Sequence, residues 1–270
     1  MGQENNYSTW VEIDLSAIED NVRYVRELSG VQVMATVKAN AYGHGVLPVA
    51  RAALQGGATW CGVARIEEAL ELQDAGLDCP ILVLGYIPAG RLPDAIKQEI
   101  SMTVWGHEQV KMVSELREKG GIPARLHLKV DTGMGRLGCP PETAVPLAEY
   151  ISELPGILLE GIFTHFARAD ELDSSTSDHQ EEIFRTIIFE LQERGLKPPL
   201  VHAANSAASL TRPSAYFDLL RLGIAMYGLH PSPERPAPAS FRPALTWKSL
   251  LSQVKVLPAG SGVSYGHEYI

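Results

Sequence analysis

The chain has 270 residues, of which 45% are hydrophobic and 20% charged, as in an ordinary folded protein that can bury a large core. A formal net charge of −9 without any Lys/Arg-rich run excludes a general nucleic-acid binder, and no stretch approaches the roughly 18 apolar residues that cross a bilayer. Three widely spaced cysteines form neither a disulfide framework nor a metal-binding pattern, which with a polar amino terminus favours the cytoplasm.

Short apolar runs alternate with amphipathic segments along most of the chain. A strand-like piece over residues 10–15 comes first, and Ser16 is a good N-cap for a helix that starts at Ala17. Eight further strands are expected at residues 31–37, 60–64, 80–85, 102–105, 125–131, 159–165, 200–204 and 219–224. Helices between them include residues 66–75, 108–119, 144–154 and 177–194, and the glycines placed to end helices are Gly57, Gly76, Gly120 and Gly195. This alternation predicts an α/β protein with a (β/α)8 barrel.

A proline-rich segment divides the chain after the last predicted barrel strand. Five prolines fall within residues 230–243, which excludes a regular helix or a central strand. A long surface loop would explain the segment, but a strand-rich stretch resumes at 245, which favours a connection between domains. We therefore expect a barrel over 11–230, a connection over 231–244, and the first strands of an incomplete C-terminal β domain over 245–270.

Lys38 directly follows the first predicted barrel strand, at residues 31–37. Because side chains alternate along a strand, Lys38 points to the face opposite the valines of that strand. A lysine at a strand end is usually a solvated surface charge. A buried lysine loses hydration, its pKa falls, and its neutral amine can form a Schiff base with an aldehyde. The words V-K-A-N-A-Y-G-H-G, residues 37–45, closely resemble the pyridoxal-phosphate attachment segment of bacterial alanine racemases, which are fold-type III enzymes.

The predicted strand over 125–131 points alternate residues into the barrel, namely Arg125, His127, Lys129 and Asp131. Ionisable groups inside a barrel must pair or serve a site, unless this is a solvated edge strand. The segment H-L-K-V-D-T-G-M-G-R-L-G, residues 127–138, is similar to the same family. That similarity implies that Arg136 contacts the cofactor's phenolic oxygen and the substrate carboxylate, and that Lys129 is carbamylated and holds Arg136 in place.

The later strands end in further polar residues, where barrels place their active groups. His165 by itself would be a hydrogen-bonded core histidine, whereas the resemblance places its ring beside the cofactor and in contact with an arginine. The last two strands of a barrel commonly bind phosphate. The cofactor contacts implied there by the resemblance are Asn205, Ser206, Gly223 and Ile224, with Tyr42 reaching from the first strand.

Arg221 is expected to point inward on the last strand. A salt bridge to a barrel carboxylate such as Asp131 would explain a buried arginine. The resemblance instead implies that Arg221 faces the pyridine nitrogen of the cofactor. Arginine offers only hydrogen-bond donors and effectively never loses its proton, so that nitrogen would stay unprotonated. The resulting weaker electron sink suits a racemase more than a transaminase.

Tyr265 lies in the word S-Y-G, residues 264–266, after the proline-rich segment. A tyrosine in a strand-rich tail normally packs against its neighbours. In alanine racemases a tyrosine in this word is the second acid/base, and the neighbouring subunit of a homodimer supplies it. The stop at Ile270 would leave these strands without partners, so we expect low activity from the 270-residue chain.

The resemblance as a whole implies a pyridoxal-phosphate-dependent alanine racemase, with Lys38 serving the D-alanine face and Tyr265 the L-alanine face. Its product would supply peptidoglycan synthesis, and no metal, nucleic acid or membrane partner is implied. Two alternatives stay open. One is a related fold-III enzyme acting on another amino acid, although the decarboxylases usually place an acid where Arg221 stands. The other is a non-catalytic barrel that binds pyridoxal phosphate.

Overall fold

The computed structural model describes residues 7–117 and 121–270, and the chain divides into two compact units. One unit is Asp14–Ala244, and the other combines the amino-terminal residues up to Ile13 with Leu245–Ile270. No helix within the described ranges is long and apolar enough to cross a membrane.

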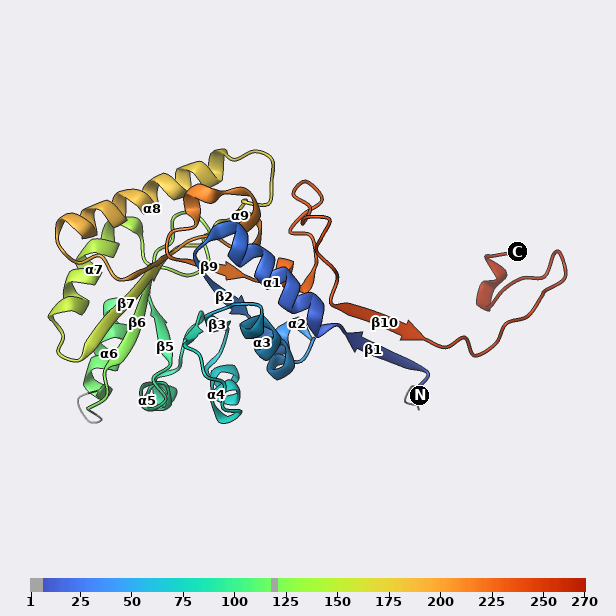
Figure 1. The fold of residues 1–270 in the computed structure, drawn as a ribbon, viewed down its shortest axis with the longest axis horizontal. Coiled ribbons are helices and arrows are strands. Elements are labelled where there is room, and N and C mark those ends of the chain that lie inside the picture. Colours follow the sequence, from blue (N-terminus) through green and yellow to red (C-terminus); the bar gives the residue numbers. More distant parts are fainter. Residues whose placement is uncertain (1–6, 118–120) are drawn as a thin grey trace. The chain divides into compact units, whose positions relative to one another are not determined.

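The first unit is built on eight parallel strands that form one sheet in the order β8-β7-β6-β5-β4-β3-β2-β9 (Figure 1). They are β2 (Gln32–Thr36), β3 (Trp60–Val63), β4 (Ile81–Val83), β5 (Ser101–Val104), β6 (Ala124–Lys129), β7 (Ile157–Phe163), β8 (Leu200–His202) and β9 (Leu219–Leu222). Two backbone bonds of 3.0 Å, from Asp218 N–H to the Val201 carbonyl and from Arg221 N–H to the Ala204 carbonyl, join the two end strands. The predicted barrel is confirmed, nearly closed and in the expected strand order.

Helices cover the outer face of the strands (Figure 1). They are α1 (Leu15–Ser29), α3 (Val46–Gln55), α4 (Ile66–Asp74), α5 (Leu92–Lys97), α6 (His107–Arg117), α7 (Pro141–Glu153), α8 (Ser175–Glu193) and α9 (Ser206–Thr211). The left-handed backbone expected after three helices is present at Gly57, Gly76 and Gly195, with φ of 100°, 69° and 70°. The predicted end of the helix over 108–119, and Gly120, lie outside the described residues.

Alternation along the strands divides the buried residues into two layers. Val33 and Ala35 of β2 belong to the large apolar core between strands and helices. Met34 belongs instead to a small cluster with Trp60, Leu82 and Leu219, one residue from each of four adjacent strands. The interior face of β2 therefore runs from Met34 through Thr36, as the spacing predicts, and leads directly to the site.

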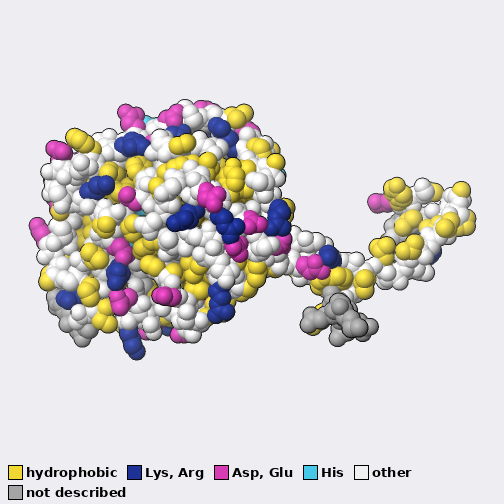
Figure 2. All heavy atoms as spheres, in the orientation of Figure 1, with side chains coloured by type: hydrophobic (Ala, Val, Ile, Leu, Met, Phe, Trp, Pro, Cys, Tyr) yellow, Lys and Arg dark blue, Asp and Glu magenta, His cyan; other side chains and the backbone are white. Residues whose placement is uncertain are grey.

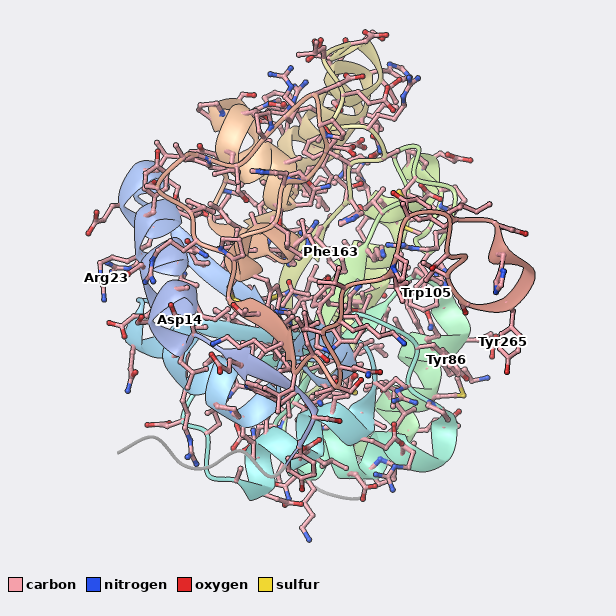
Figure 3. All side chains as sticks on the ribbon, turned by 90° about the vertical axis from the view of Figure 1, so that its right-hand side faces the viewer. Asp14, Arg23, Tyr86, Trp105, Phe163 and Tyr265 are labelled. Atoms are coloured by element: carbon pink, nitrogen blue, oxygen red, sulfur yellow. The ribbon has the colours of Figure 1, made fainter. Side chains whose placement is uncertain are left out.

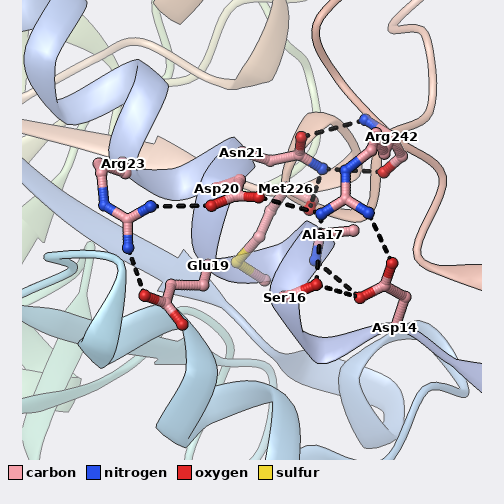
Figure 4. A network of polar contacts seen from close by, with 9 residues as sticks. All are labelled: Asp14, Ser16, Ala17, Glu19, Asp20, Asn21, Arg23, Met226 and Arg242. Carbon is pink, nitrogen blue, oxygen red and sulfur yellow. Dashed lines mark hydrogen bonds and ion pairs between the residues drawn. The ribbon is translucent and has the colours of Figure 1, made fainter.

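The first helix begins earlier than expected, because Asp14 and not Ser16 is its N-cap. The Asp14 Oδ1 atom accepts the Ala17 N–H at 3.1 Å and the Ser16 hydroxyl at 2.6 Å. Arg242 then pairs with Asp14 at 2.8 Å and with Asp20 at 3.0 Å (Figure 4). A carboxylate near a helix N-terminus also interacts favourably with the helix dipole, which a hydroxyl cannot do equally well.

The proline-rich segment packs on the barrel unit. The Asn21 side chain of α1 donates to the carbonyl oxygens of Arg242 and Met226, both at 3.1 Å (Figure 4). Phe241 and Ala244 are buried. These contacts hold the end of the segment against α1.

The second unit contains a two-stranded antiparallel sheet. Its strands are β1 (Thr9–Ile13) and β10 (Leu245–Ser249), with Trp10 opposite Lys248. The strand predicted over 10–15 therefore pairs outside the barrel, as expected. Tyr265 lies in a 3₁₀ turn, Tyr265–His267, of the same unit.

The surface of the barrel unit carries both signs of charge side by side on the face seen in Figure 2. Arg194 pairs with Glu190 and Glu149, and Arg212 pairs with Asp178 and Glu181. Ion pairs of this kind neutralise one another locally.

Candidate active site

A pocket of about 440 Å³ lies where the carboxyl ends of the barrel strands meet, at the face where barrel enzymes place their active groups. Its lining contains every predicted site residue of the barrel unit: Lys38, Tyr42, Lys129, Arg136, His165, Asn205, Ser206, Arg221, Gly223 and Ile224. Tyr265 belongs to the other unit, and its side chain is 99% exposed. The barrel thus brings together ten residues that the sequence spreads from position 38 to position 224.

Lys38 opens an unusual turn, α2 (Lys38–Tyr42), directly after the first barrel strand. Ala39, Asn40, Ala41 and Tyr42 all have φ between 52° and 53°. For residues other than glycine this left-handed conformation costs roughly 1–2 kcal/mol each, so surrounding contacts must hold it. The Ala41 N–H donates to the Val37 carbonyl at 2.8 Å, and the Asn40 side chain accepts the Val46 N–H at 2.8 Å.

The Lys38 amine is half-buried and lies in a positively charged surrounding. Burial lowers its pKa, the nearby Arg136 guanidinium lowers it further, and the Glu68 carboxylate opposes both. A lowered pKa raises the fraction of neutral amine, which is the form that attacks an aldehyde. The amine also lies 5.9 Å from the centre of the Tyr42 ring.

Hydroxyl and N–H groups gather around Gly223, at the start of the segment that follows β9. The Ser206 Oγ atom accepts the N–H groups of Gly223 at 2.9 Å and of Ala225 at 3.3 Å. A Cβ on Gly223 would lie 3.3 Å from the Tyr42 hydroxyl oxygen and 3.7 Å from Ser206 Oγ. Burial raises the pKa of Tyr42, so its hydroxyl stays a donor. The Tyr42 and Ser206 hydroxyls beside Gly223 form a cradle that can donate to a phosphate group, and the space that a Cβ would fill stays open for it.

Arg221 is buried and held by four acceptors. Its Nη1 donates to His202 Nδ1 at 2.8 Å, and its Nη2 lies 2.6 Å from the Thr164 carbonyl, 2.7 Å from the Ala203 carbonyl and 3.2 Å from His165 Nδ1. Burial lowers the pKa of Arg221 to about 9, which leaves it a cation at neutral pH.

Among the described residues Arg221 does not form the salt bridge to Asp131, because its guanidinium donates to His202 and to the carbonyls of Thr164 and Ala203. Asp131 instead accepts the N–H groups of Gly133 and Gly135, each at 3.0 Å. Burial alone would raise the pKa of Asp131, but these backbone donors outweigh it and lower the pKa. Arg221 therefore keeps its charge without a carboxylate partner in the pocket.

Two histidines next to Arg221 are neutral. Burial lowers the pKa of His165 and of His202 well below 6.5, and the Arg221 charge adds to the effect in both. Phe163, near the centre of the barrel in Figure 3, stacks on the His202 ring with centroids 4.6 Å apart and planes 8° apart. The Arg221 guanidinium also lies 5.1 Å from the centre of the Phe163 ring.

Lys129 is buried at the end of β6, and Arg136 is exposed at the pocket in the loop that follows. Burial lowers the pKa of Lys129 to about 8, with the charges of Arg221 and Arg136 contributing. Because β6 lies between β5 and β7, it is an interior strand and the solvated-edge alternative is wrong. Inward-pointing ionisable residues of this strand, such as His127 and Lys129, are therefore buried in the barrel.

Glu160 was not identified from the sequence, although its carboxylate contacts two of the inward residues of β6, Arg125 and His127. Its carboxylate accepts from Ser101, lies 3.1 Å from His127 Nε2 and 3.2 Å from Arg125 Nη1. The pairing of β6 with β7 shifts register so that Leu126 faces Leu159 while His127 faces Gly161. This bulge turns Glu160 inward, against the alternation that an undisturbed strand would follow.

The fold and the site together define a barrel enzyme whose reactive amine, phosphate cradle and buried arginine suit a phosphorylated pyridine aldehyde. Residues 13–231 match the family model described as alanine racemase, N-terminal domain. The alanine racemase of Desulfosudis oleivorans is 43% identical over 98% of this chain and 71% of its own length. That of Desulforamulus reducens is 44% identical over 96% of this chain and 71% of its own length. The chain belongs to the alanine racemase family, whose members are isomerases that use pyridoxal phosphate.

Solved structures agree with this assignment. Alanine racemase from Streptomyces lavendulae has a TM-score of 0.91 and 41% identity, over 98% of this chain and 71% of that one. A histidine racemase from Leuconostoc mesenteroides subsp. sake has a TM-score of 0.88 and 30% identity, over 99% of this chain and 72% of that one. The same barrel therefore occurs in proteins named for a small and for a large amino acid.

Proposed function

We propose that this protein interconverts L-alanine and D-alanine with pyridoxal phosphate attached to Lys38. The observation that carries the proposal is the meeting, in one pocket, of the half-buried Lys38 amine, the cradle around Gly223 and the charged Arg221. An aldehyde, a phosphate and a ring nitrogen are the three features of pyridoxal phosphate that these groups match. When bound, this cofactor withdraws electrons from the amino acid and labilises its Cα proton.

Each residue of the pocket has a role in the proposal. The cradle of Tyr42, Ser206, Gly223 and Ile224 binds the phosphate, with Asn205 beside it. Arg136 orients the substrate carboxylate, and its position depends on a carbamate formed on Lys129. His165 packs beside the cofactor ring as a neutral imidazole.

Arg221 determines which reaction is favoured. A guanidinium only donates hydrogen bonds, and its proton stays on it at neutral pH. The cofactor nitrogen facing it keeps its lone pair free to accept. Electron withdrawal from the substrate is therefore moderate, which favours return of the proton to Cα over transfer of the amino group.

Inversion at Cα needs a proton acceptor on one face and a donor on the other. We assign the D-alanine face to Lys38 and the L-alanine face to Tyr265 of a second copy in a homodimer. The exposure of the Tyr265 side chain within its own unit supports this assignment, because its hydroxyl is available to a second copy. We further propose a cytoplasmic enzyme that supplies D-alanine for peptidoglycan, and its three free cysteines agree with a reducing compartment.

The test is incubation of the purified chain with pyridoxal phosphate and L-alanine, followed by chiral analysis of the amino acid. Borohydride reduction and peptide mapping should place the cofactor on Lys38. L-histidine in a parallel reaction separates an alanine racemase from a racemase of another amino acid. Cofactor on another lysine would refute the site. Attachment at Lys38 with racemisation of histidine and not of alanine would refute the proposed substrate. Attachment at Lys38 without racemisation of either amino acid would leave a binding barrel and refute the activity.

A further inference from the structure

The carboxylate of Glu68, on helix α4, bridges two loops at the mouth of the barrel. Its Oε1 atom accepts the N–H of Ala39, the residue next to Lys38, at 2.7 Å. Its Oε2 atom accepts the N–H groups of Ala64 at 2.7 Å and Arg65 at 3.2 Å, directly after β3. One side chain thus ties the turn after β2 to the end of the neighbouring strand.

The turn that Glu68 holds is the strained one. Four consecutive residues other than glycine, Ala39–Tyr42, have a positive φ. Left-handed backbone of this length persists only when contacts from outside the turn fix it. The Ala41 N–H bond to the Val37 carbonyl holds the start of the turn, since the Val37 N–H donates to the Gly62 carbonyl at 2.9 Å, and Glu68 holds the turn separately at Ala39.

Only a carboxylate satisfies all three backbone donors at once. Its two oxygens accept on both sides and carry no hydrogen. A glutamine would offer one oxygen, and its NH2 group would face an N–H on the other side. Because two donors lie near Oε2 and one near Oε1, the glutamine oxygen would remain with Ala64 and Arg65, and Ala39 would lose its acceptor.

The charge of Glu68 also acts on the amine beside it. Burial and the Arg136 charge lower the pKa of Lys38, and Glu68 opposes them. The side chain that fixes the turn therefore also limits how far the amine loses its proton. This second effect depends on charge and not on shape, so the two can be separated by substitution.

We propose that Glu68 is a positioning residue for the reaction, which fixes the left-handed turn after Lys38 against the end of β3. Its importance for catalysis rests on the proposed attachment of the cofactor at Lys38. The contacts with Ala39, Ala64 and Arg65 do not depend on that attachment.

The first measurement is amide hydrogen exchange in the full chain prepared without cofactor. In E68Q the Ala39 amide should exchange about tenfold faster or more, the effect expected from loss of a charge-assisted hydrogen bond. The matched control is E71Q, which removes an exposed carboxylate from the same helix and should leave Ala39 exchange unchanged. Faster exchange confined to Ala64, Arg65 and the first turn of α4 would show a helix cap only and overturn the proposal.

The second measurement is the pH dependence of trace acetylation of Lys38, followed by peptide mass spectrometry. Loss of the Glu68 charge should move the midpoint for Lys38 to lower pH in E68Q, and not in E71Q. E68D keeps the charge on a shorter side chain. It should lose the protection of Ala39 and move the midpoint less than E68Q does. Equal midpoints in E68Q and the parent would overturn the electrostatic part.

Neither measurement needs bound cofactor, so failure of this inference and failure of the proposed function are distinguishable. If borohydride mapping finds the cofactor on another lysine while E68Q speeds exchange of the Ala39 amide, the proposed function fails and the positioning role of Glu68 stands. If Lys38 carries the cofactor, and E68Q matches the parent both in racemisation of alanine and in exchange of the Ala39 amide, the positioning role of Glu68 fails and the proposed function stands. Should E68Q not fold, the Ala39 amide of E68D decides, because unchanged protection there overturns the proposal.

Discussion

The Nδ1 atom of His127 lies 2.9 Å from the Nε2 atom of His202, deep inside the barrel. Arg221 has only donors, so His202 Nδ1, 2.8 Å from Arg221 Nη1, must accept. The neutral His202 ring therefore carries its hydrogen on Nε2 and donates to His127. His127 in turn donates from Nε2 to Glu160, 3.1 Å away. The chain of bonds has one direction only, from the guanidinium to the carboxylate.

This chain of bonds predicts that the protein loses stability in mild acid. Burial lowers the pKa of His127 and His202 below 6.5, so below that pH the unfolded chain binds more protons than the folded one. The free energy of unfolding should then decrease as the pH is lowered from 6.5 to 5, by at most about 2 kcal/mol per histidine. Urea unfolding at several pH values measures it.

His127→Gln should reduce that slope, because one buried imidazole no longer titrates. The control is His179→Gln, which removes an exposed ring outside the chain of bonds and should leave the slope unchanged. An unfolding free energy that does not vary between pH 5 and 6.5 in the parent would contradict the neutral, directed arrangement.

Gly223→Ala should weaken binding of pyridoxal phosphate by about tenfold or more, a loss of about 1.4 kcal/mol. The added Cβ would lie 3.3 Å from the Tyr42 hydroxyl and occupy the space proposed for phosphate. Titration of cofactor-free protein with pyridoxal phosphate, followed by absorbance, gives the dissociation constant. Gly90→Ala is the control, since its Cβ would meet nothing within 4 Å. Parent-like affinity in Gly223→Ala would place the phosphate elsewhere.

Lys129 should form a carbamate with dissolved carbon dioxide. The reaction needs a neutral amine, and burial lowers the pKa of Lys129 to about 8. The modified fraction should therefore rise as the pH increases through about 8, at fixed carbon dioxide. Carbon-13 NMR with labelled bicarbonate detects the carbamate carbon. Lys129→Arg should remove that signal, because arginine stays protonated. A signal that survives in this variant would belong to another lysine.

Much of the architecture was predictable because strands and helices alternate with clear periods. The inward face of β2, through Met34 and Thr36 to Lys38, followed from period-two spacing alone, since nothing disturbs that strand. The N-cap at Asp14 was missed because Asp14 and Ser16, two positions apart, are both good N-cap residues, and Asp14 is further held by Arg242, more than 200 positions away. No local pattern contains that information.

The polar interior was less predictable than the pocket. His127 could be placed inward, but its partner Glu160 lies at a bulge that reverses the expected alternation, and no orientation was predicted for His202. Glu68 reads as an ordinary helix residue, and only the left-handed turn beside it shows what it holds. Sequence motifs predicted the residues proposed to contact the cofactor, whereas the residues that hold them in place depend on contacts that only the folded structure shows.

Arg221→Glu should change which reaction the site favours. A carboxylate facing the pyridine nitrogen of the cofactor would share a proton with it, making the ring a stronger electron sink. Racemisation of alanine should fall by about 10²-fold or more, since a preorganised donor is lost. Pyruvate should appear, up to one equivalent per pyridoxal phosphate supplied, because the amino group would be left on the cofactor. Chiral analysis and a pyruvate assay on the same sample measure both products.

Arg221→Lys is the matched control for this change of reaction. It keeps a positive charge and donors near His202 and the Thr164 carbonyl, although without the planar fork that reaches four acceptors at once. It should lose racemase activity without gaining pyruvate, because no carboxylate is present to share a proton with the ring. Pyruvate from both variants at equal rates would mean that simple loosening of the site releases the amino group. Racemisation by Arg221→Glu at the parent rate, without pyruvate, would mean that Arg221 does not face the ring nitrogen at all.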